Sequence, residues 1–116
     1  MSDLAKLECI PKRGGIAPLK GQALNDLLER LGGDWRSIGD LRLEKTFKFK
    51  NFRQALEFTN TVGELAEQED HHPAILTEWG RVTVAWWTHK IRGLHRNDFI
   101  MAAKTDSISA ALFTPR

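Results

Sequence analysis

The sequence has few of the residues and segments that mark secreted or membrane proteins. Cys9 is its single cysteine, which excludes an intrachain disulfide framework. No stretch approaches the ~20 consecutive apolar residues of a membrane-spanning helix, and the N-terminal residues lack the apolar core of a signal peptide. Tyrosine is absent, so no phenolic side chain is available as an acid or base. We therefore expect a cytoplasmic protein that makes no membrane contact.

The charge balance excludes a further class of partner. The net charge is +2 and the basic residues are interspersed with acidic ones, which argues against a nucleic-acid partner. A chain of 116 residues suits one domain over 1–116 and leaves no room for a second. The first eighteen residues hold two prolines and an adjacent pair of glycines, which predicts an extended, irregular arm over 1–18.

Periodic apolar residues predict the secondary structure of the rest of the chain. The expected elements are a helix over 20–31, a strand over 41–50, a helix over 52–68, a short strand over 75–77, a strand over 81–89 and a helix over 97–111. This order favours an α+β domain with a mostly antiparallel sheet and helices on one face. Because such a sheet has free edges that can pair with a second copy, we also expect a homo-oligomer.

Two details of this pattern concern single residues. Leu41 continues the apolar alternation of its strand, so we expect it on the buried face. Asn51 can cap the helix over 52–68, with Gln54 at the capping-box position. Phe52 and Leu56 begin the apolar stripe of that helix, so we expect both to face the core.

The chemistry of the chain is concentrated in residues 71–95, which hold all four histidines. Histidine is the side chain whose ordinary pKa lies nearest neutrality, so it suits proton transfer. His71 and His72 stand between the long helix and Pro73, and His89 stands at the end of a predicted strand. Because a helix end and a strand end can meet at one rim of the sheet, we expect these three histidines in one pocket.

Two acidic residues are placed where they can support the histidines. Glu67 lies one helical turn before His71 and can orient that ring if the helix continues. Asp98 opens the last predicted helix and can face the same rim. His95 differs from the other histidines, because it follows Leu94 in a polar connection, and we expect it to be a solvated loop residue.

Other interpretations of the histidine cluster stay open to different degrees. A histidine at a helix end is often only a favourable cation near the helix dipole, and this applies to His71 and His72. The chain lacks the His-x3-His and Cys-x2-Cys spacings, so we expect no metal site. Nucleophilic catalysis has no good candidate, because Cys9 lies in the arm and no serine stands in a nucleophile-elbow context.

The tryptophans around the predicted hairpin have two interpretations. The ordinary one is that Trp79, Trp86 and Trp87 pack in the core or at an interface. The functional one is a flat wall on which a heterocycle stacks beside the histidines. Trp79 is the candidate for this wall, because it lies in a hairpin turn and such turns are ordinarily exposed.

The residues around the histidines carry a family resemblance. Glu67, His71-His72-Pro73, His89, Gly93-Leu94 and Asp98 resemble the pattern of the pterin-4a-carbinolamine dehydratase family. Further matching positions are Trp35, Phe47, Phe49, Phe52, Ala55, Phe58 and Ala66. The opening Cys9-x-Pro11-x-x-Gly14-Gly15-x-x-Pro18-Leu19 is similar to the N-terminal arm of bacterial and plastid members. The resemblance covers about residues 9–112.

The resemblance implies a fold and a reaction. The fold is a four-stranded antiparallel sheet with helices on one face, assembled into homodimers or homotetramers. The reaction is the loss of water from a 4a-hydroxy-tetrahydropterin, the product of an aromatic amino-acid hydroxylase, to give the quinonoid dihydropterin. The pterin is the substrate of this dehydratase, and the resemblance implies neither a metal nor another cofactor.

The resemblance also implies roles for individual residues. The catalytic set is His71, His72 and His89, of which the first and the last transfer protons and His72 holds or polarises the pterin. The substrate-binding set is Glu67, Pro73, Trp79 and Asp98. The chain departs from the family at Ile75, where many members have tryptophan, and Trp79 is the residue that could rebuild that wall.

A rival interpretation comes from proteins that resemble this family without being enzymes. Such proteins act as oligomeric binding or assembly factors, in transcription complexes or in RuBisCO biogenesis. The intact histidine cluster favours the enzyme, because an assembly platform has no need for three imidazoles at this spacing. A third interpretation is the same dehydration in another pterin pathway, such as molybdenum-cofactor metabolism.

Overall fold

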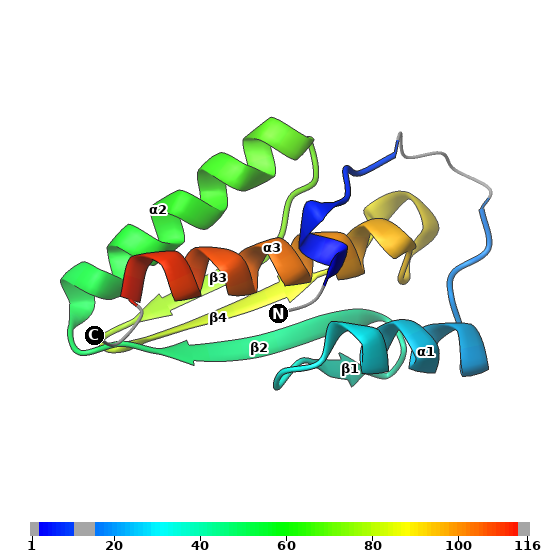
Figure 1. Cartoon of the computed structure of the whole chain (residues 1–116), viewed down its shortest axis with the longest axis horizontal. Coiled ribbons are helices and arrows are strands. Elements are labelled where there is room, and N and C mark those ends of the chain that lie inside the picture. The colour runs from blue at the N-terminus through cyan, green and yellow to red at the C-terminus, as the bar shows by residue number, and fades with distance from the viewer. Residues whose placement is uncertain (1–2, 11–15, 114–116) are drawn as a thin grey trace.

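The computed structural model describes residues 3–10 and 16–113, which form an antiparallel sheet covered on one face by helices (Figure 1). The strands are β1 (Arg36–Ile38), β2 (Arg42–Lys48), β3 (Ala74–Glu78) and β4 (Arg81–Trp86). The helices are α1 (Gly21–Leu31), α2 (Phe52–Glu69) and α3 (Arg96–Phe113), with single 3₁₀ turns η1 (Asp3–Lys6) and η2 (His89–Ile91). Within the described residues the strand order is β1-β2-β4-β3.

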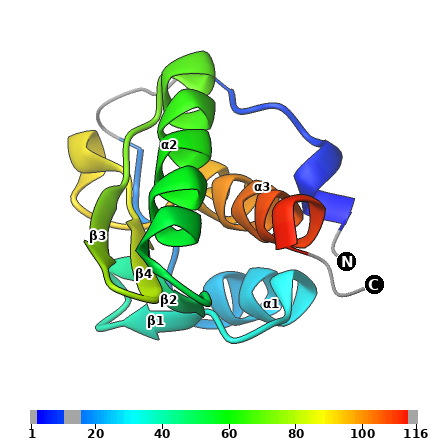
Figure 2. The same cartoon turned by 90° about the vertical axis from the view of Figure 1, so that its left-hand side faces the viewer.

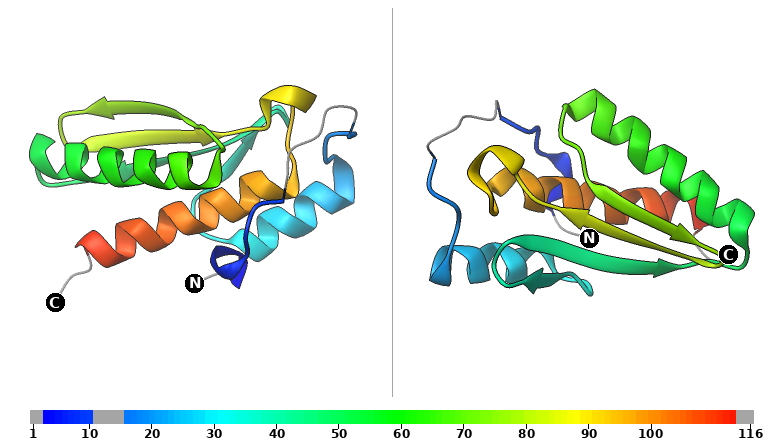
Figure 3. Two further views of the ribbon diagram at one scale, coloured as in Figure 1. Left: turned by 90° about the horizontal axis from the view of Figure 1, so that it is seen from above. Right: turned by 180° about the vertical axis from the view of Figure 1, so that it is seen from behind.

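The predicted α+β class is confirmed, with a four-stranded antiparallel sheet in the described part of the chain. Seen from above, α1, α2 and α3 all lie on the same side of the sheet (Figure 3). The opposite face carries polar pairs such as Thr46 and Thr83, whose hydroxyls are 3.0 Å apart. The described helices therefore leave the opposite face of the sheet uncovered.

The helix α2 begins as its sequence predicts. The Asn51 side chain accepts a hydrogen bond from the Gln54 N–H at 2.9 Å, which caps the first turn. Gln54 in turn accepts from the Lys50 N–H at 3.0 Å, one residue earlier than in a standard capping box. The prediction was wrong for Phe52 and Leu56, which are each 42% exposed, because the buried stripe of α2 begins one turn later on a different face. That stripe consists of Ala55, Phe58, Val62 and Ala66.

The core fills the space between the sheet and α3. Residues 97–103 of α3 are all buried, because β2 and β4 cover one side of this helix and η1, α1 and α2 cover others (Figure 2). A helix that is buried on all sides is apolar around most of its circumference, as this one is. The inner face of the sheet contributes Leu43, Phe47, Val82, Val84 and Trp86. Within the described residues, no helix is both long and apolar enough to cross a membrane.

The strand β1 has no counterpart in the predicted elements. Its three residues pair with β2, from Arg36 opposite Glu44 to Ile38 opposite Arg42. The connecting turn has positive φ at both Gly39 and Asp40, which is the geometry of a tight hairpin turn. Three residues are too few to show an alternating pattern, so the sequence gives no periodic signal here. The turn also leaves Leu41 60% exposed, so its predicted burial was wrong.

The predicted irregular arm is in part ordered. Residues 3–6 form η1, and Leu4 is fully buried in the core against α3. Asn97 bonds both backbone groups of Ile10, accepting from its N–H at 3.0 Å and donating to its carbonyl at 2.8 Å. The Cys9 N–H donates to Glu69 at 3.4 Å. The segment with Pro11, Gly14 and Gly15 lies outside the described residues.

Candidate active site

The end of α2 places His71 and His72 in different environments. Asp70 adopts the left-handed conformation, with φ of 50° and ψ of 45°, and its N–H bonds the Ala66 and Glu67 carbonyls. This reversal closes the helix and is a common helix ending. As a result His71 is buried, with 1% exposure, while the adjacent His72 is exposed.

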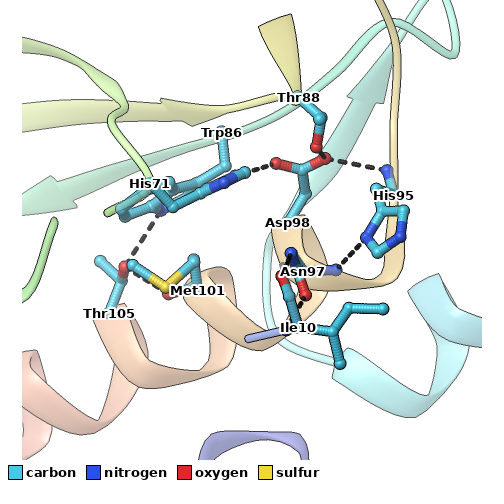
Figure 4. A network of polar contacts seen from close by, with 9 residues as sticks. All are labelled: Ile10, His71, Trp86, Thr88, His95, Asn97, Asp98, Met101 and Thr105. Atoms are coloured by element: carbon cyan, nitrogen blue, oxygen red, sulfur yellow. Dashed lines mark hydrogen bonds and ion pairs between the residues drawn. The ribbon is translucent and has the colours of Figure 1, made fainter. Parts of the chain in front are cut away.

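His71 is held at one ring nitrogen and over one ring face. Its Nε2 lies 2.6 Å from Oδ1 of Asp98, and its ring is stacked on the indole of Trp86 with centroids 5.8 Å apart (Figure 4). Because an ionised carboxylate only accepts hydrogen bonds, Nε2 carries the proton in this pair. The other nitrogen, Nδ1, has no hydrogen-bond partner among the described residues. A neutral ring in this arrangement therefore presents a lone pair at Nδ1.

Asp98 joins three separate parts of the chain. Besides His71, its carboxylate accepts from the Thr88 hydroxyl at 2.8 Å and from the His95 N–H at 2.9 Å (Figure 4). Its position in the first turn of α3 adds the favourable end of the helix dipole. A fully buried carboxylate needs such donors, because desolvation of an unpaired charge is costly. The expectation that Asp98 faces the histidines is met, and the contact is direct.

Glu67 contacts a different histidine from the one expected. Its Oε2 lies 2.5 Å from Nε2 of His72. Helical spacing predicts that Glu67 contacts His71 if the helix continues, but α2 ends at Glu69. The left-handed turn at Asp70 therefore moves His71 to Asp98 and brings His72 to Glu67. Both members of this second pair are exposed.

His89 lies in η2 rather than at a strand end. The strand β4 ends at Trp86, three residues earlier than predicted, and Thr88 then pairs with Gly93 in an isolated bridge around the 3₁₀ turn. The turn is tight at Gly93, where a Cβ atom would lie 2.7 Å from the Pro18 side chain. His89 packs against Trp87 with ring centroids 4.5 Å apart. This loop turns the exposed imidazole back toward the end of α2.

One pocket brings the three predicted histidines together. Its lining consists of His71, His72, His89 and Lys90, and its volume is about 140 Å³. His71 forms its buried part, while the other three residues are exposed at its rim. Lys90 is a lining residue that the sequence does not predict, because nothing distinguishes it there from other exposed lysines. Its only signal was its position next to His89.

The structure does not bring Trp79 into this pocket. Trp79 is 73% exposed in the turn between β3 and β4. His71 and His72 precede β3 and His89 follows β4, so the histidines lie at the open end of the same hairpin. A five-residue strand separates the two ends by about 16 Å. Pro73 directly follows His72 and starts the turn into β3, so it fixes the backbone beside the pocket.

His95 is not a simple solvated residue. Its Nδ1 accepts the Asn97 N–H at 3.0 Å, and its own N–H bonds Asp98, so the two side chains cap α3 reciprocally. Burial lowers the pKa of the His95 ring; the Asp98 carboxylate opposes this shift, and His71 and Arg96 add to it. The prediction that His95 is a solvated loop residue was therefore wrong, because its ring accepts a hydrogen bond that caps the N-terminus of α3.

The donor chemistry of the site suits proton transfer. Within residues 3–10 and 16–113, no group of three or more histidine, cysteine, aspartate or glutamate side chains is arranged to hold a metal ion. Asp98 and Glu67 are instead each committed to one imidazole. Both carboxylates are predicted from the sequence, but the predicted partner of Glu67 was wrong.

The fold and the pocket together define a small α+β protein with a histidine site at the open end of its hairpin. The sequence model of the family described as pterin 4 alpha carbinolamine dehydratase matches residues 17–108. The chain belongs to this family, as its residue pattern indicates.

Proteins similar over nearly the whole chain carry the provisional name pterin-4-alpha-carbinolamine dehydratase. The relative from Microcystis aeruginosa is 51% identical over 111 residues, which cover 93% of this chain and 95% of that protein. The relative from Rubrobacter xylanophilus is 49% identical over 108 residues, which cover 93% and 100% respectively.

Two solved structures share the fold. A transcriptional coactivator/pterin dehydratase from Brucella melitensis superposes with a TM-score of 0.73 and 34% identity, over 78% of this chain and 97% of that one. A pterin dehydratase-like protein identified as a RuBisCO assembly factor in the alpha-carboxysome gives a TM-score of 0.58, over 68% and 93% respectively. At 22% identity, the second likeness shows the fold alone.

Proposed function

We propose that this chain is a hydro-lyase that removes water from a 4a-hydroxy-tetrahydropterin and releases the quinonoid dihydropterin. The observation that carries the proposal is the His71–Asp98 pair. It leaves an unpartnered ring nitrogen at the buried part of a pocket that His72 and His89 also line. Family membership and the names of the relatives support the same reaction.

The reaction needs two proton transfers and no change of oxidation state. The bond between C4a and its hydroxyl oxygen breaks, and a proton from an acid lets the oxygen leave as water. The adjacent ring nitrogen loses its proton to a base, and its electron pair forms a double bond to C4a. Imidazoles suit both tasks near neutral pH, so the proposed mechanism uses neither a metal nor another cofactor.

The geometry suggests a division of these tasks. His71 serves as the base, because Asp98 holds the proton on Nε2 and leaves Nδ1 to accept. His89 serves as the acid from the rim of the pocket, where an exposed ring can exchange protons with water. His72, oriented by Glu67, holds the pterin beside them.

The strand β3 supports the predicted homo-oligomer. In the described residues β3 pairs with β4 on one side and has no strand on the other, and a free edge can pair with a second copy. Antiparallel pairing of two β3 strands about Leu76 would set Trp79 of the partner subunit opposite Pro73. That arrangement would restore the aromatic wall that Trp79 cannot supply within its own chain. Light scattering of the purified protein would give the number of subunits.

The proposed reaction is tested by turnover of a freshly generated 4a-hydroxy-tetrahydropterin. We expect His71→Ala, His72→Ala and His89→Ala each to lower kcat/KM, by about a hundredfold or more for the two proton-transfer residues. The control is His95→Asn, which retains a capping side chain for α3 and lies outside the pocket lining.

Three results would contradict the proposal. If the wild type is active and the folded variants all match it, the assignment of the three histidines is wrong. A folded wild type without turnover would favour the non-catalytic binding or assembly factor, for which the histidines have no task. Activity that is lost to a chelator and restored by a metal ion would favour a metal site instead.

A further inference from the structure

The ring of His71 is supported from two directions, by Asp98 at its edge and by Trp86 at its face. The Asp98 bond fixes the position of Nε2 but allows the ring to tilt about that contact. The indole of Trp86 lies nearly parallel to the imidazole, at an interplanar angle of 18°, and restricts this tilt. The direction in which Nδ1 points therefore depends on where the indole lies.

The indole of Trp86 is itself fixed by a hydroxyl on α3. Its Nε1–H donates to Oγ1 of Thr105 at 3.1 Å. The Thr105 hydroxyl donates its own proton to the Met101 carbonyl at 2.7 Å, so the oxygen is left to accept from the indole (Figure 4). Trp86 and Thr105 are both fully buried. Neither hydrogen bond can therefore be replaced easily by bulk water.

The helix α3 thus supports His71 at two points. Thr105 lies seven residues after Asp98, which is about two helical turns, so both side chains project from the same face of α3. Valine would fill nearly the same volume as threonine without burying a hydroxyl. A hydroxyl at this place is costly to bury unless it is hydrogen-bonded, and here it provides the acceptor for the indole.

We propose that Thr105 is a positioning residue, which acts through Trp86 to set the plane of the His71 ring. The proposal rests on the dehydration proposed above, in which Nδ1 of His71 accepts the substrate proton. Thr105 does not line the pocket, and its hydrogen bond to the indole is its contact toward His71. Small errors in the placement of a reacting group can slow a reaction greatly, even when the substrate still binds.

The kinetic test compares two substitutions that separate the hydroxyl from the volume of Thr105. We expect Thr105→Val to lower kcat by about tenfold while KM stays within about twofold, because the exposed rim of the pocket is untouched. Thr105→Ser retains the hydroxyl, and its kcat should stay within about threefold of the wild type. All variants are assayed at a temperature where their unfolding curves show them to be folded.

Thr61→Val is the matched control. Thr61 lies in α2 and bonds the Glu57 carbonyl four residues earlier, just as Thr105 bonds Met101. Thr61→Val removes the same type of hydrogen bond between a threonine hydroxyl and a helix carbonyl, away from the site, so kcat should not change. If Thr105→Ser loses as much kcat as Thr105→Val, or if Thr105→Val retains wild-type kcat, the positioning role is refuted.

A second measurement separates this proposal from the proposed reaction. The side-chain ¹⁵N resonances of His71 report its protonation, tautomer and order in the absence of substrate. We expect them to shift or broaden in Thr105→Val and to stay unchanged in Thr61→Val. If the wild type shows no dehydratase activity, the proposed function fails. The resonances still decide whether Thr105 positions the His71 ring. Unchanged His71 resonances in Thr105→Val would overturn the positioning role.

Discussion

Replacing Asp98 by asparagine removes the charge on which three donors converge. The carboxylate accepts from the Thr88 hydroxyl, the His95 N–H and Nε2 of His71. An amide offers a single oxygen. If that oxygen keeps the two bonds to Thr88 and His95, its NH₂ group faces the imidazole. The ring must then place a lone pair on Nε2 and the proton on Nδ1, which is the opposite of the arrangement that the proposed mechanism needs.

The expected losses of stability and of kcat in Asp98→Asn follow from these contacts. Hydrogen bonds to a charged group contribute about 1.5–3 kcal/mol each. Since asparagine can retain some of the three hydrogen bonds, we expect Asp98→Asn to lower the free energy of unfolding by about 2–3 kcal/mol. For a domain of this size that corresponds to a fall in Tm of about 10 °C. A base with the wrong tautomer should lower kcat by about a hundredfold or more.

The assay follows formation of the quinonoid dihydropterin by absorbance, below the Tm of the variant. Asp106→Asn is the matched control, because Asp106 lies on the same helix and accepts from Lys45 at 2.8 Å and Trp35 at 3.0 Å. That variant should lose stability and retain wild-type kcat. A folded Asp98→Asn protein that turns over at the wild-type rate would refute the role assigned to the buried pair.

Three further predictions concern stability and the rim of the pocket. Burial lowers the pKa of His95 below its ordinary value of 6.5, so the unfolded chain binds a proton more readily, and stability should fall as the pH drops below about 6.5. The test is urea unfolding at about pH 7.5 and about pH 5.5. The free energy of unfolding should fall less from the higher to the lower pH in His95→Asn than in the wild type. Glu67→Gln should change the free energy of unfolding by less than about 1 kcal/mol, because the pair with His72 is exposed, yet it should lower kcat/KM; an unchanged kcat/KM would remove Glu67 from the site. Asn51→Ala removes the cap of α2 and should cost about 1 kcal/mol in thermal or urea unfolding, with kcat unaltered below the Tm.

Long, regular elements are the part of the fold that the sequence predicts well. The 18 residues of α2 carry several turns of apolar periodicity with Asn51 before them, so both the helix and its start are readable. The hairpin of β3 and β4 is readable because Gly80 interrupts two apolar runs. The histidines of the site are readable because their spacing belongs to a family pattern, and the pocket brings all three together.

The partner of each side chain is what the sequence cannot specify. Glu67 contacts His72 rather than His71 because one left-handed residue, Asp70, reverses the chain between them. Helical spacing cannot anticipate such a residue. The position of Trp79 in a hairpin turn predicts that it is exposed, but exposure does not tell at which end of a hairpin a side chain lies. The prediction for His95 was wrong for a related reason, since it lies in a polar connection while its ring caps a helix.

The ordered start of the chain shares an anchor with the pocket. Asn97 forms two hydrogen bonds with the backbone of Ile10, and the next residue, Asp98, accepts a hydrogen bond from His71. Proteolytic cleavage or a bulky fusion close to Leu4 would weaken the hydrogen bonds between Asn97 and Ile10 and disturb the first turn of α3. Residues 3–10 would then influence the proposed reaction although none of them lines the pocket.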